Sequence, residues 1–312
     1  MRRTLLVLLA GLVLPLAGLV SKAEAATGPI VIGVSFPVLM YSPFFDEMNS
    51  VAGKAARELG VKLVVMNAQW NDSQQAAGLG SLVQQGVQGI LVAPKDADRL
   101  VPAIEAAVKA GIPVATIDTP ANTTQVLFHL GADNLEGARE AARFIIEKLG
   151  NKGSVIELEG PVTTHANAKA RKEGFEEEIN KSNVQLLASK SAGADWDRAL
   201  AGTIVRDLIA KYPKLDAVYA ANDGLALGAV DGMTVSNVDP SKKIIVCFDV
   251  NPTTAIYLKQ GDITAAIDQL PGEQMTQAMQ VLVDYIKNKT QPPQKIILLK
   301  PKLVTKATLP AG

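Results

Sequence analysis

Residues 89–118 read GILVAPKDADRLVPAIEAAVKAGIPVATID, and this stretch decides the fold class. It opens with a short apolar run at 89–93 and continues with helical periodicity over 97–110, where a glycine follows. A second apolar run then covers 112–117 and stops at Asp118. An apolar strand, an amphipathic helix ended by glycine and another apolar strand form the unit that builds parallel sheets covered by helices. The stretch therefore predicts an α/β fold.

The same unit recurs on both sides of this stretch. Helical periodicity separates most of the apolar runs, and their near-continuous hydrophobicity is typical of strands buried on both faces. The runs lie at 30–36, 61–66, 89–93, 112–117, 154–158, 184–188, 217–220, 244–248 and 264–267. The rhythm is interrupted over 122–131, so we predict two similar doubly wound parallel-sheet domains. A single (β/α)₈ barrel is the alternative that length and alternation leave open.

The N-terminal segment predicts export. Two arginines precede an uncharged apolar run over 5–20, and a small-residue pattern ends at Ala25. This arrangement is typical of a secretory signal peptide at 1–25, cleaved after Ala25. A membrane anchor is the alternative, although the run is shorter than the roughly 20 apolar residues of a span. The single cysteine, Cys247, lies within a distant apolar run and predicts a buried side chain, not a lipid anchor or a disulfide. We therefore expect a free protein in a bacterial periplasm.

Composition and motifs exclude several classes of function. Lys and Arg number 31, as do Asp and Glu, so no excess of positive charge attracts nucleic acid. The Gly-x-Ser-x-Gly elbow, the Walker loop, paired cysteines and the His-x-x-x-His motif do not occur in the sequence. His129 and His165 have no nucleophile or metal ligand at motif spacing and are expected to be structural. The sequence predicts no enzyme, no metal and no cofactor.

Polar residues gather where the predicted strands end. Parallel strands bring their carboxyl ends to one edge of a sheet, which is where ligands bind in open α/β folds. The residues at these ends are Asp118, Asn222, Asp223, Asp249 and Gln269, together with the run Ser42-Pro43-Phe44-Phe45. Carboxylates and amides hydrogen-bond adjacent hydroxyls, and an aromatic ring covers an apolar C–H face. We therefore expect a neutral polyhydroxylated ligand.

For several of these residues a structural role is equally compatible with the sequence. Ser42, Asp223 and Asp249 are each of a type that caps helices, and Pro43 suits the first helical position. The two phenylalanines after Pro43 could belong to the core. Their joint placement at the same end of successive strands favours a binding site.

A set of short motifs runs through the chain from about residue 30 to residue 306. They are Ser42-Pro43-Phe44-Phe45, Gly111-Ile112-Pro113-Val114 with Asp118, Ala132-Asp133-Asn134, Arg171-Lys172-Glu173-Gly174-Phe175, Ala194-Asp195-Trp196-Asp197, Asn222-Asp223 with Ala226-Leu227-Gly228-Ala229, Phe248-Asp249, and Gln269-Leu270-Pro271. In these motifs the chain resembles the ribose-type sugar-binding proteins of ABC importers, which share their fold with the cores of LacI-type repressors. A repressor is disfavoured, because an export signal stands where its DNA-binding helices are expected.

The resemblance implies two domains joined by three crossings of the chain, that is, by a three-segment hinge. The first domain would comprise 26–132 and 270–300, and the second would comprise 133–269 and 301–312. Short apolar runs near the C-terminus, with no helix between them, are consistent with such crossings. Closure of the two domains about this hinge is likewise what the resemblance implies.

The resemblance also assigns roles to the residues at the strand ends. It implies that Phe44, Phe45 and Trp196 sandwich a sugar ring, while polar side chains hydrogen-bond its hydroxyls. The hydroxyl-binding residues would be Asp118, Arg171, Asn222, Asp249 and Gln269. The complete predicted ligand-binding set is Ser42, Phe44, Phe45, Asp118, Thr119, Arg171, Trp196, Asn222, Phe248, Asp249 and Gln269.

The first domain departs from the family's pattern at several positions. The ribose binder has an arginine directly after the aspartate that matches Asp118, where this chain has Thr119. Ala93 and Ala132 stand where that pattern has asparagine and serine, and the segment 37–41 is longer and is expected near the cleft. The first-domain wall has thus lost polar contacts, which discriminate strongly between related ligands. A different pentose, a deoxy sugar or a polyol is expected in place of ribose.

The predicted function is the periplasmic solute-binding component of an ABC transporter. A monomer would close around a small, pentose-like sugar or polyol, and the permease in the inner membrane would recognise the closed form. The alternative is a sensor that delivers the same signal to a chemoreceptor or a histidine kinase. The sequence leaves this choice open, because both kinds of partner read the same closed surface. A nucleic-acid partner is not expected.

Overall fold

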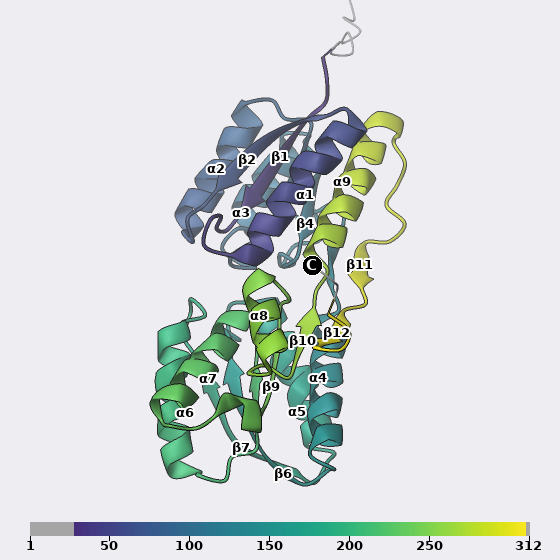
Figure 1. Ribbon diagram of the computed structural model, residues 1–312. Helices are drawn as coiled ribbons and strands as arrows, with labels where there is room; N and C mark the ends of the chain where they lie inside the picture. Colours follow the sequence, from purple (N-terminus) through teal and green to yellow (C-terminus); the bar gives the residue numbers. More distant parts are fainter. Residues whose placement is uncertain (1–27, 310–312) are drawn as a thin grey trace, which may run out of the picture.

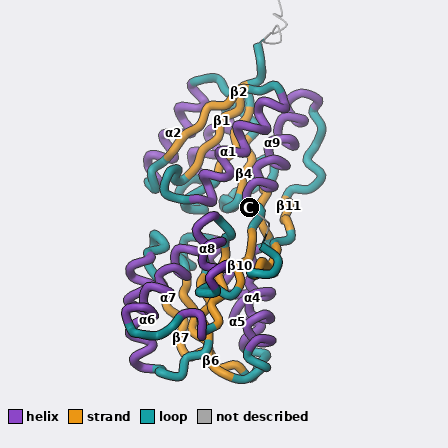
Figure 2. Tube along the Cα trace, in the orientation of Figure 1, coloured by secondary structure: helices purple, strands orange, loops and turns teal. Residues whose placement is uncertain are grey.

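The computed structural model describes residues 28–309, and the predicted signal peptide, its cleavage point and the last three residues lie outside the described residues. The described chain forms two six-stranded sheets, one in each half of the molecule, with helices on both faces of each sheet (Figures 1 and 2). Both sheets are open, because each has two edge strands. The predicted fold of two doubly wound sheets is confirmed, and the single-barrel alternative is wrong.

The first sheet is entirely parallel, and its strands lie in the order β2-β1-β3-β4-β5-β11. They are β1 (Val31–Phe36), β2 (Lys62–Asn67), β3 (Gly89–Val92), β4 (Val114–Ile117), β5 (His129–Ala132) and β11 (Ile296–Leu299). The chain enters at β1, moves outward to β2 and then reverses direction to β3. Such a reversal leaves a crevice at the carboxyl ends of the strands on either side of it.

Two pairs of helices cover this sheet. On one face lie α1 (Pro43–Leu59) and α9 (Pro271–Asn288), and on the other lie α2 (Asp72–Gln84) and α3 (Val101–Lys109). Helix α1 begins with proline and ends at Gly60, whose φ of 65° is left-handed and suits glycine. The α1 residues that the sheet buries, among them Phe45, Met48 and Ala52, follow helical spacing.

Helix α3 begins later than the sequence predicts, at Val101 and not at 97. The reason is a local turn. Asp96 Oδ1 accepts hydrogen bonds from the backbone N–H groups of Asp98 and Arg99, both at 2.9 Å. An aspartate that bonds its own backbone in this way stabilises a turn in competition with a helix.

The second sheet repeats the arrangement of the first, with the order β7-β6-β8-β9-β10-β12. Its strands are β6 (Gly153–Glu159), β7 (Val184–Ser191), β8 (Ala217–Ala220), β9 (Ile244–Phe248), β10 (Ala265–Asp268) and β12 (Lys302–Thr305). All neighbours are parallel except β12, which pairs antiparallel with β10. The two sheets therefore place equivalent strand ends, and equivalent crevices, on either side of one cleft.

Helices also cover both faces of the second sheet. One face carries α4 (Asn134–Lys148) and α5 (Ala166–Ile179), and the other carries α6 (Arg198–Lys211), α7 (Asp223–Val235) and α8 (Pro252–Gln260). A short 3₁₀ turn, η1 (Pro240–Lys242), precedes β9. In the core of this half, Phe175 and Tyr219 stack with ring centroids 4.0 Å apart, and Cys247 is buried as predicted. Between residues 28 and 309, no helix has the length and apolar character needed to cross a membrane.

The chain passes from one sheet to the other three times: between β5 and α4, between β10 and α9, and between β11 and β12. The predicted three-segment hinge corresponds to these passages. The predicted domain boundaries, after 132, 269 and 300, stay a prediction, and the outer ends of the two domains lie beyond the described residues.

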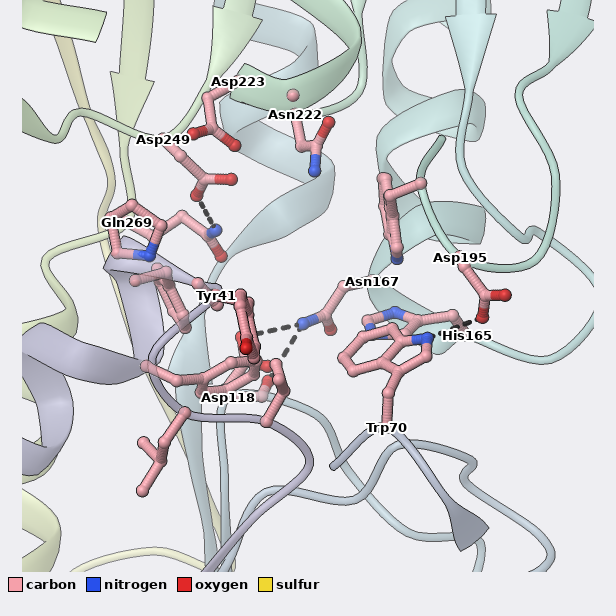
Figure 3. A pocket seen from close by; sticks show the side chains of 18 of the residues that line it. Tyr41, Trp70, Asp118, His165, Asn167, Asp195, Asn222, Asp223, Asp249 and Gln269 are labelled. Carbon is pink, nitrogen blue, oxygen red and sulfur yellow. Dashed lines mark hydrogen bonds between the residues drawn. The ribbon is translucent and has the colours of Figure 1, made fainter. Parts of the chain in front are cut away.

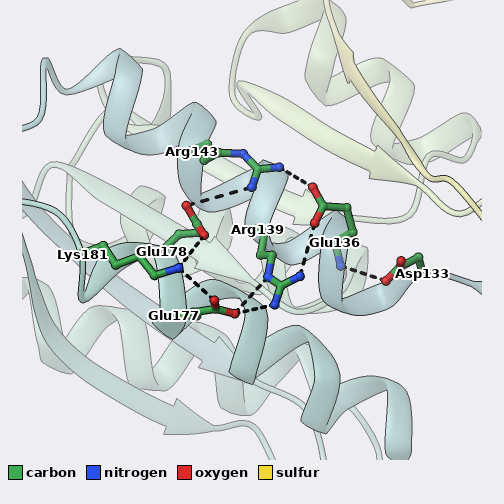
Figure 4. Close-up of polar contacts among 7 residues, drawn as sticks. All are labelled: Asp133, Glu136, Arg139, Arg143, Glu177, Glu178 and Lys181. Atoms are coloured by element: carbon green, nitrogen blue, oxygen red, sulfur yellow. Dashed lines mark hydrogen bonds and ion pairs between the residues drawn. The ribbon is translucent and has the colours of Figure 1, made fainter.

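An ion-pair network on the surface links α4 to α5 directly after the first passage (Figure 4). Asp133 Oδ1 accepts a hydrogen bond from the backbone N–H of Glu136 at 3.0 Å and caps α4. Arg139 of α4 donates from both Nε and Nη2 to Glu177 Oε2 of α5, at 2.9 and 2.7 Å. Exposed pairs of this kind contribute at most about 1 kcal/mol each, so the network orients the two helices more than it stabilises the domain.

Candidate functional site

A cavity of about 730 Å³ lies between the two sheets, at the carboxyl ends of their strands (Figure 3). Its size is within the range of small-molecule sites, roughly 300 to 1,000 Å³. Both halves of the chain contribute to its wall. Of the predicted ligand-binding residues, those on the wall are Ser42, Phe44, Phe45, Asp118, Arg171, Trp196, Asn222, Asp249 and Gln269.

The first-domain wall begins with the first turn of α1, which presents two aromatic rings. Phe44 and Phe45 meet edge to face, with centroids 5.1 Å apart. Phe45 also packs against Phe36 in the core. It is therefore both a core residue and a residue of the cavity wall. Ser42 occupies the N-cap position, but its side chain makes no cap hydrogen bond. The capping alternative for Ser42 is therefore wrong, and the residue lines the cavity.

The longer segment at 37–41 lies at the mouth of this wall, as expected. Met40 and Tyr41 line the cavity there with 81% and 88% of their surface exposed. Two side chains hold the segment: the Leu39 N–H donates to Asn67 Oδ1 at 3.2 Å, and the Met40 N–H donates to Asp46 Oδ1 at 2.7 Å. Exposed apolar groups at a cavity mouth are suited to cover a bound molecule.

Asp118 is the buried carboxylate of the first-domain wall. Its Oδ2 accepts a hydrogen bond from the Thr119 hydroxyl at 2.9 Å. Its Oδ1 accepts one from Asn167 Nδ2 at 3.1 Å (Figure 3). Burial raises the pKa of Asp118 to about 6, although the Thr119 bond and the nearby Arg171 guanidinium act in the opposite direction. The group is an acceptor for ligand hydroxyls when it is ionised.

Two predicted ligand-binding residues, Thr119 and Phe248, lie behind the wall and not on it. Thr119 is fully buried, and its hydroxyl lies between Asp118 and His165 Nε2, the latter at 3.4 Å. Phe248 is buried beneath the guanidinium of Arg171, which is 4.1 Å from the ring centroid. Both residues therefore act by holding a wall residue in place.

Arg171 and Trp196 form the centre of the second-domain wall. Arg171 Nε donates to Asn134 Oδ1 at 2.7 Å, and its Nη1 donates to the Ala221 carbonyl at 2.6 Å. The guanidinium is thereby fixed in one orientation. The Trp196 ring lies directly against Gly160, where any Cβ would come within 2.3 Å of the ring. Glycine at 160 is thus a steric requirement for this ring position.

The remaining second-domain groups follow β8, β9 and β10. Asn222 Oδ1 caps α7 by accepting the Leu225 N–H at 2.9 Å, so here the predicted cap also lines the cavity. For Asp223 and Asp249 the capping alternative is wrong, because Asn222 caps α7 and Asn251 caps α8. Asp249 instead accepts a hydrogen bond from Gln269 Nε2.

The amide oxygen of Gln269 is not used in that bond. Gln269 Oε1 is buried and has no hydrogen-bond partner among the described residues. A buried amide oxygen without a partner costs about 1 to 3 kcal/mol. Nearby, burial and, to a lesser extent, the neighbouring Asp249 raise the pKa of Asp223 to about 6. Burial likewise raises the pKa of Asp249.

Backbone strain is concentrated around the cavity, on both of its walls. Six wall residues adopt left-handed backbone angles, with φ between 51° and 75°, although none is glycine. They are Met40, Gln69, Trp70, Asp118, Trp196 and Asp249. Each such residue costs on the order of 1–3 kcal/mol, and such residues cluster at functional sites.

The sequence pattern of the periplasmic binding protein domain family matches residues 32–290. The chain belongs to this family. The ribose import binding protein of Escherichia coli is 33% identical over 258 residues, covering 83% of this chain and 84% of that protein. A solved periplasmic solute binding protein of an ABC transporter from Actinobacillus succinogenes, with bound D-allose, has a TM-score of 0.83 and 27% identity over 89% of this chain and 98% of its own. The myo-inositol binding protein of Caulobacter, bound to myo-inositol, has a TM-score of 0.80 and 26% identity over 93% and 96%.

The predicted family resemblance is thus confirmed. Membership places this binding protein in the periplasm, and its relatives are binding proteins and not enzymes. Among residues 28–309, no group of three or more His, Cys, Asp and Glu side chains is arranged to hold a metal ion.

The cavity of this binding protein also contains residues that the sequence analysis did not select. They are Asn67, Gln69, Trp70, His165, Asn167 and Asp195. Trp70 follows β2, so its position after a strand end is a signal that the sequence contains. Its indole Nε1 donates to Asp195 Oδ1 at 2.6 Å and joins the two domains across the mouth of the cleft (Figure 3).

The two histidines have different positions in this binding protein. His129 is buried in β5, with its Nδ1 3.0 Å from the Thr116 hydroxyl, as expected for a structural residue. His165 lines the cavity, and its structural role stays a prediction. Its ring meets Trp196 edge to face at 5.6 Å. Burial lowers the pKa of His165 to about 3, so the ring is neutral at physiological pH.

Proposed function

We propose that this protein captures a small sugar or polyol in the interdomain cavity and delivers it to an ABC permease in the inner membrane. The observation that carries the proposal is the set of hydroxyl-binding side chains, Asp118, Asn222 and the Asp249–Gln269 pair, on a cavity wall that also carries aromatic rings. Hydroxyl-binding acceptors beside ring faces suit a molecule with O–H groups at its edge and C–H groups on its face. Relatives named for ribose and D-apiose import, and neighbours with bound D-allose and myo-inositol, support the same class.

Within that class, we propose a ligand other than ribose. The arginine of the ribose pattern is replaced by Thr119, whose hydroxyl is already bonded to Asp118. Ala93 and Ala132 are buried and offer no polar side chain to the cavity. A deoxy sugar needs fewer polar contacts from the first domain than ribose does, and a different pentose or a polyol places its hydroxyls differently.

We also propose that export involves cleavage after Ala25 and that the mature protein acts as a monomer. Both walls of the cavity come from one chain, so no second copy is needed to complete the site. The domain boundaries at 132, 269 and 300 place the hinge at the three passages between the sheets. A permease is the proposed partner, because the curated relatives are import binding proteins.

The test is a thermal-shift screen of the mature protein against pentoses, hexoses, deoxy sugars, polyols and inositols. Amino acids and nucleosides serve as the comparison sets. A ligand at 100 times its dissociation constant adds about 2.7 kcal/mol to the free energy of unfolding. One or more carbohydrates are expected to raise the melting temperature, with D-ribose producing a smaller shift than the best of them. A shift caused by an amino acid or a nucleoside, and by no carbohydrate, would overturn the proposal.

A further inference from the structure

Asn167 makes the contacts from which this inference starts. Its Nδ2 donates to Asp118 twice, to the backbone carbonyl and to Oδ1, both at 3.1 Å. Asn167 belongs to α5 of the second domain, and Asp118 follows β4 of the first. The two residues are 5% exposed and line the cavity from opposite sides. The contact therefore exists only while the domains are closed on each other.

The Asp118 carboxylate depends on this contact for its orientation. Its two protein donors are the Thr119 hydroxyl on Oδ2 and the Asn167 amide on Oδ1. Each carboxylate oxygen has a second lone pair, so one acceptor position per oxygen remains for a ligand. Two acceptor positions held in one plane match two adjacent hydroxyls.

The charges of the groups around Asp118 also indicate which ligands the cavity can bind. Both donors to Asp118 are neutral, whereas an arginine beside this aspartate would supply a cation. On the wall as a whole, four carboxylates face the cavity with one guanidinium: Asp118, Asp195, Asp223 and Asp249 with Arg171. An excess of negative charge on the wall disfavours any anionic ligand and favours a ligand whose groups donate hydrogen bonds.

We propose that Asn167 is a specificity-determining, positioning residue of the site. It orients Asp118 as an acceptor for two adjacent ligand hydroxyls, and it does so only in the closed form. The contact between Asn167 and Asp118 therefore serves both ligand recognition and domain closure. The ligand class that follows is a neutral sugar or polyol with vicinal hydroxyls, to the exclusion of sugar acids and sugar phosphates. This inference rests on the proposed function.

The test compares three variants of the mature protein with the wild type. Asn167→Ala removes the donor, and Asn167→Asp replaces the amide by a carboxyl group of the same shape. Asn180→Ala is the matched control, because Asn180 is an exposed asparagine at the other end of the same helix. Each protein is titrated calorimetrically with D-allose, D-ribose and myo-inositol, and with D-glucuronate as the anionic probe.

Asn167→Ala is expected to weaken binding of the best probe at least about tenfold, mainly through faster dissociation, while Asn180→Ala binds as the wild type does. Asn167→Asp gives a readout that a purely structural role would not move. Two facing carboxylates repel each other at pH 8, but a protonated Asp at 167 can donate to Asp118 at pH 5. The affinity of the Asn167→Asp variant is therefore expected to rise as the pH falls, whereas that of the wild type is expected to fall.

The possible outcomes separate this inference from the proposed function. If a neutral carbohydrate binds the wild type and Asn167→Ala binds it within about twofold of Asn180→Ala, the inference is wrong and the proposed function stands. Binding of D-glucuronate as tight as that of the best neutral probe also overturns the inference. If no carbohydrate binds the wild type, the proposed function and the inference both fail.

Discussion

The two walls of the cavity differ in how their polar groups are held. On the second-domain wall, partners in the same domain or at the hinge fix Arg171, Asn222 and Asp249. On the first-domain wall, aromatic rings and an exposed loop predominate, and the carboxylate of Asp118 takes one of its donors from the opposite domain. The second-domain wall is thus preorganised for hydroxyls before closure, whereas the first-domain wall is completed by closure. Preorganised groups are expected to contribute most of the affinity.

The largest effect is expected from the preorganised wall, at Asp249. Asp249→Ala removes an acceptor for ligand hydroxyls and leaves the Gln269 amide without its partner, so the dissociation constant should rise at least about 100-fold. The fold should be retained, because Asn251 and not Asp249 caps α8. Calorimetry and circular dichroism check the two statements. Asp207→Ala is the matched control, because Asp207 is exposed and pairs only with the exposed Arg206. Substantial unfolding of Asp249→Ala would show a structural role instead.

A smaller effect is expected at Trp196, the aromatic face of the same wall. Trp196→Ala should weaken binding about 10- to 30-fold, because the ligand loses a ring to pack against. The chain has two tryptophans, Trp70 and Trp196, and both line the cavity. In a Trp70→Phe background the fluorescence of Trp196 should change when the best carbohydrate is added. An unchanged spectrum at saturating ligand would place the ring outside the binding site.

The affinity for the ligand should depend on pH and should fall about tenfold between pH 7 and pH 5. Burial raises the pKa of Asp118 to about 6, so lowering the pH from 7 to 5 protonates an acceptor that the ligand hydroxyls need. Affinity should therefore fall by about a factor of ten over that range. Calorimetric titrations at pH 5, 6 and 7 measure it. An affinity that is constant or rises at pH 5 would contradict an ionised acceptor on the first-domain wall.

The titration of Asp118 should also affect the stability of the unliganded protein. Stability should rise as the pH falls, whereas affinity should fall. The pKa of Asp118 is above its usual 3.8, so folding favours the protonated form. The corresponding stability is fully present below pH about 4 and is lost as the pH rises through about 6. Thermal melts of the wild type and of Asp118→Asn at pH 4 and pH 7 isolate this contribution, which the variant should lack.

The smallest effect is expected where the two walls touch at the mouth of the cleft. Trp70→Phe keeps the ring but removes the hydrogen bond from Nε1 to Asp195, which is partly exposed and therefore weak. The dissociation constant should rise about threefold, through faster opening and release. Stopped-flow measurement of the dissociation rate tests this, with Asp195→Asn as a second variant. A larger effect than at Asp249 would reverse the ranking of the two walls.

Much of the fold could be predicted because buried parallel strands leave a strong pattern. Continuous apolar runs ended by polar residues marked most of the strands, and the start of α3 was misplaced only because Asp96 holds a local turn. The site was predicted less completely. Thr119 and Phe248 are direct sequence neighbours of the wall residues Asp118 and Asp249, but proximity along the chain does not show which of two neighbours faces the cavity. In the structure, the neighbour packs behind the wall in both cases.

The sequence by itself determined the α/β class, the recurrence of the strand-helix unit in two halves and the collection of polar residues at the strand ends, because these follow from local periodicity and from the direction of parallel strands. Only the tertiary structure decided which side chains meet across the cleft. Trp70 and Asp195 are 125 positions apart, and Asn167 and Asp118 are 49 apart. Such contacts depend on how two separately folded domains are placed by the hinge, and no local pattern encodes that placement.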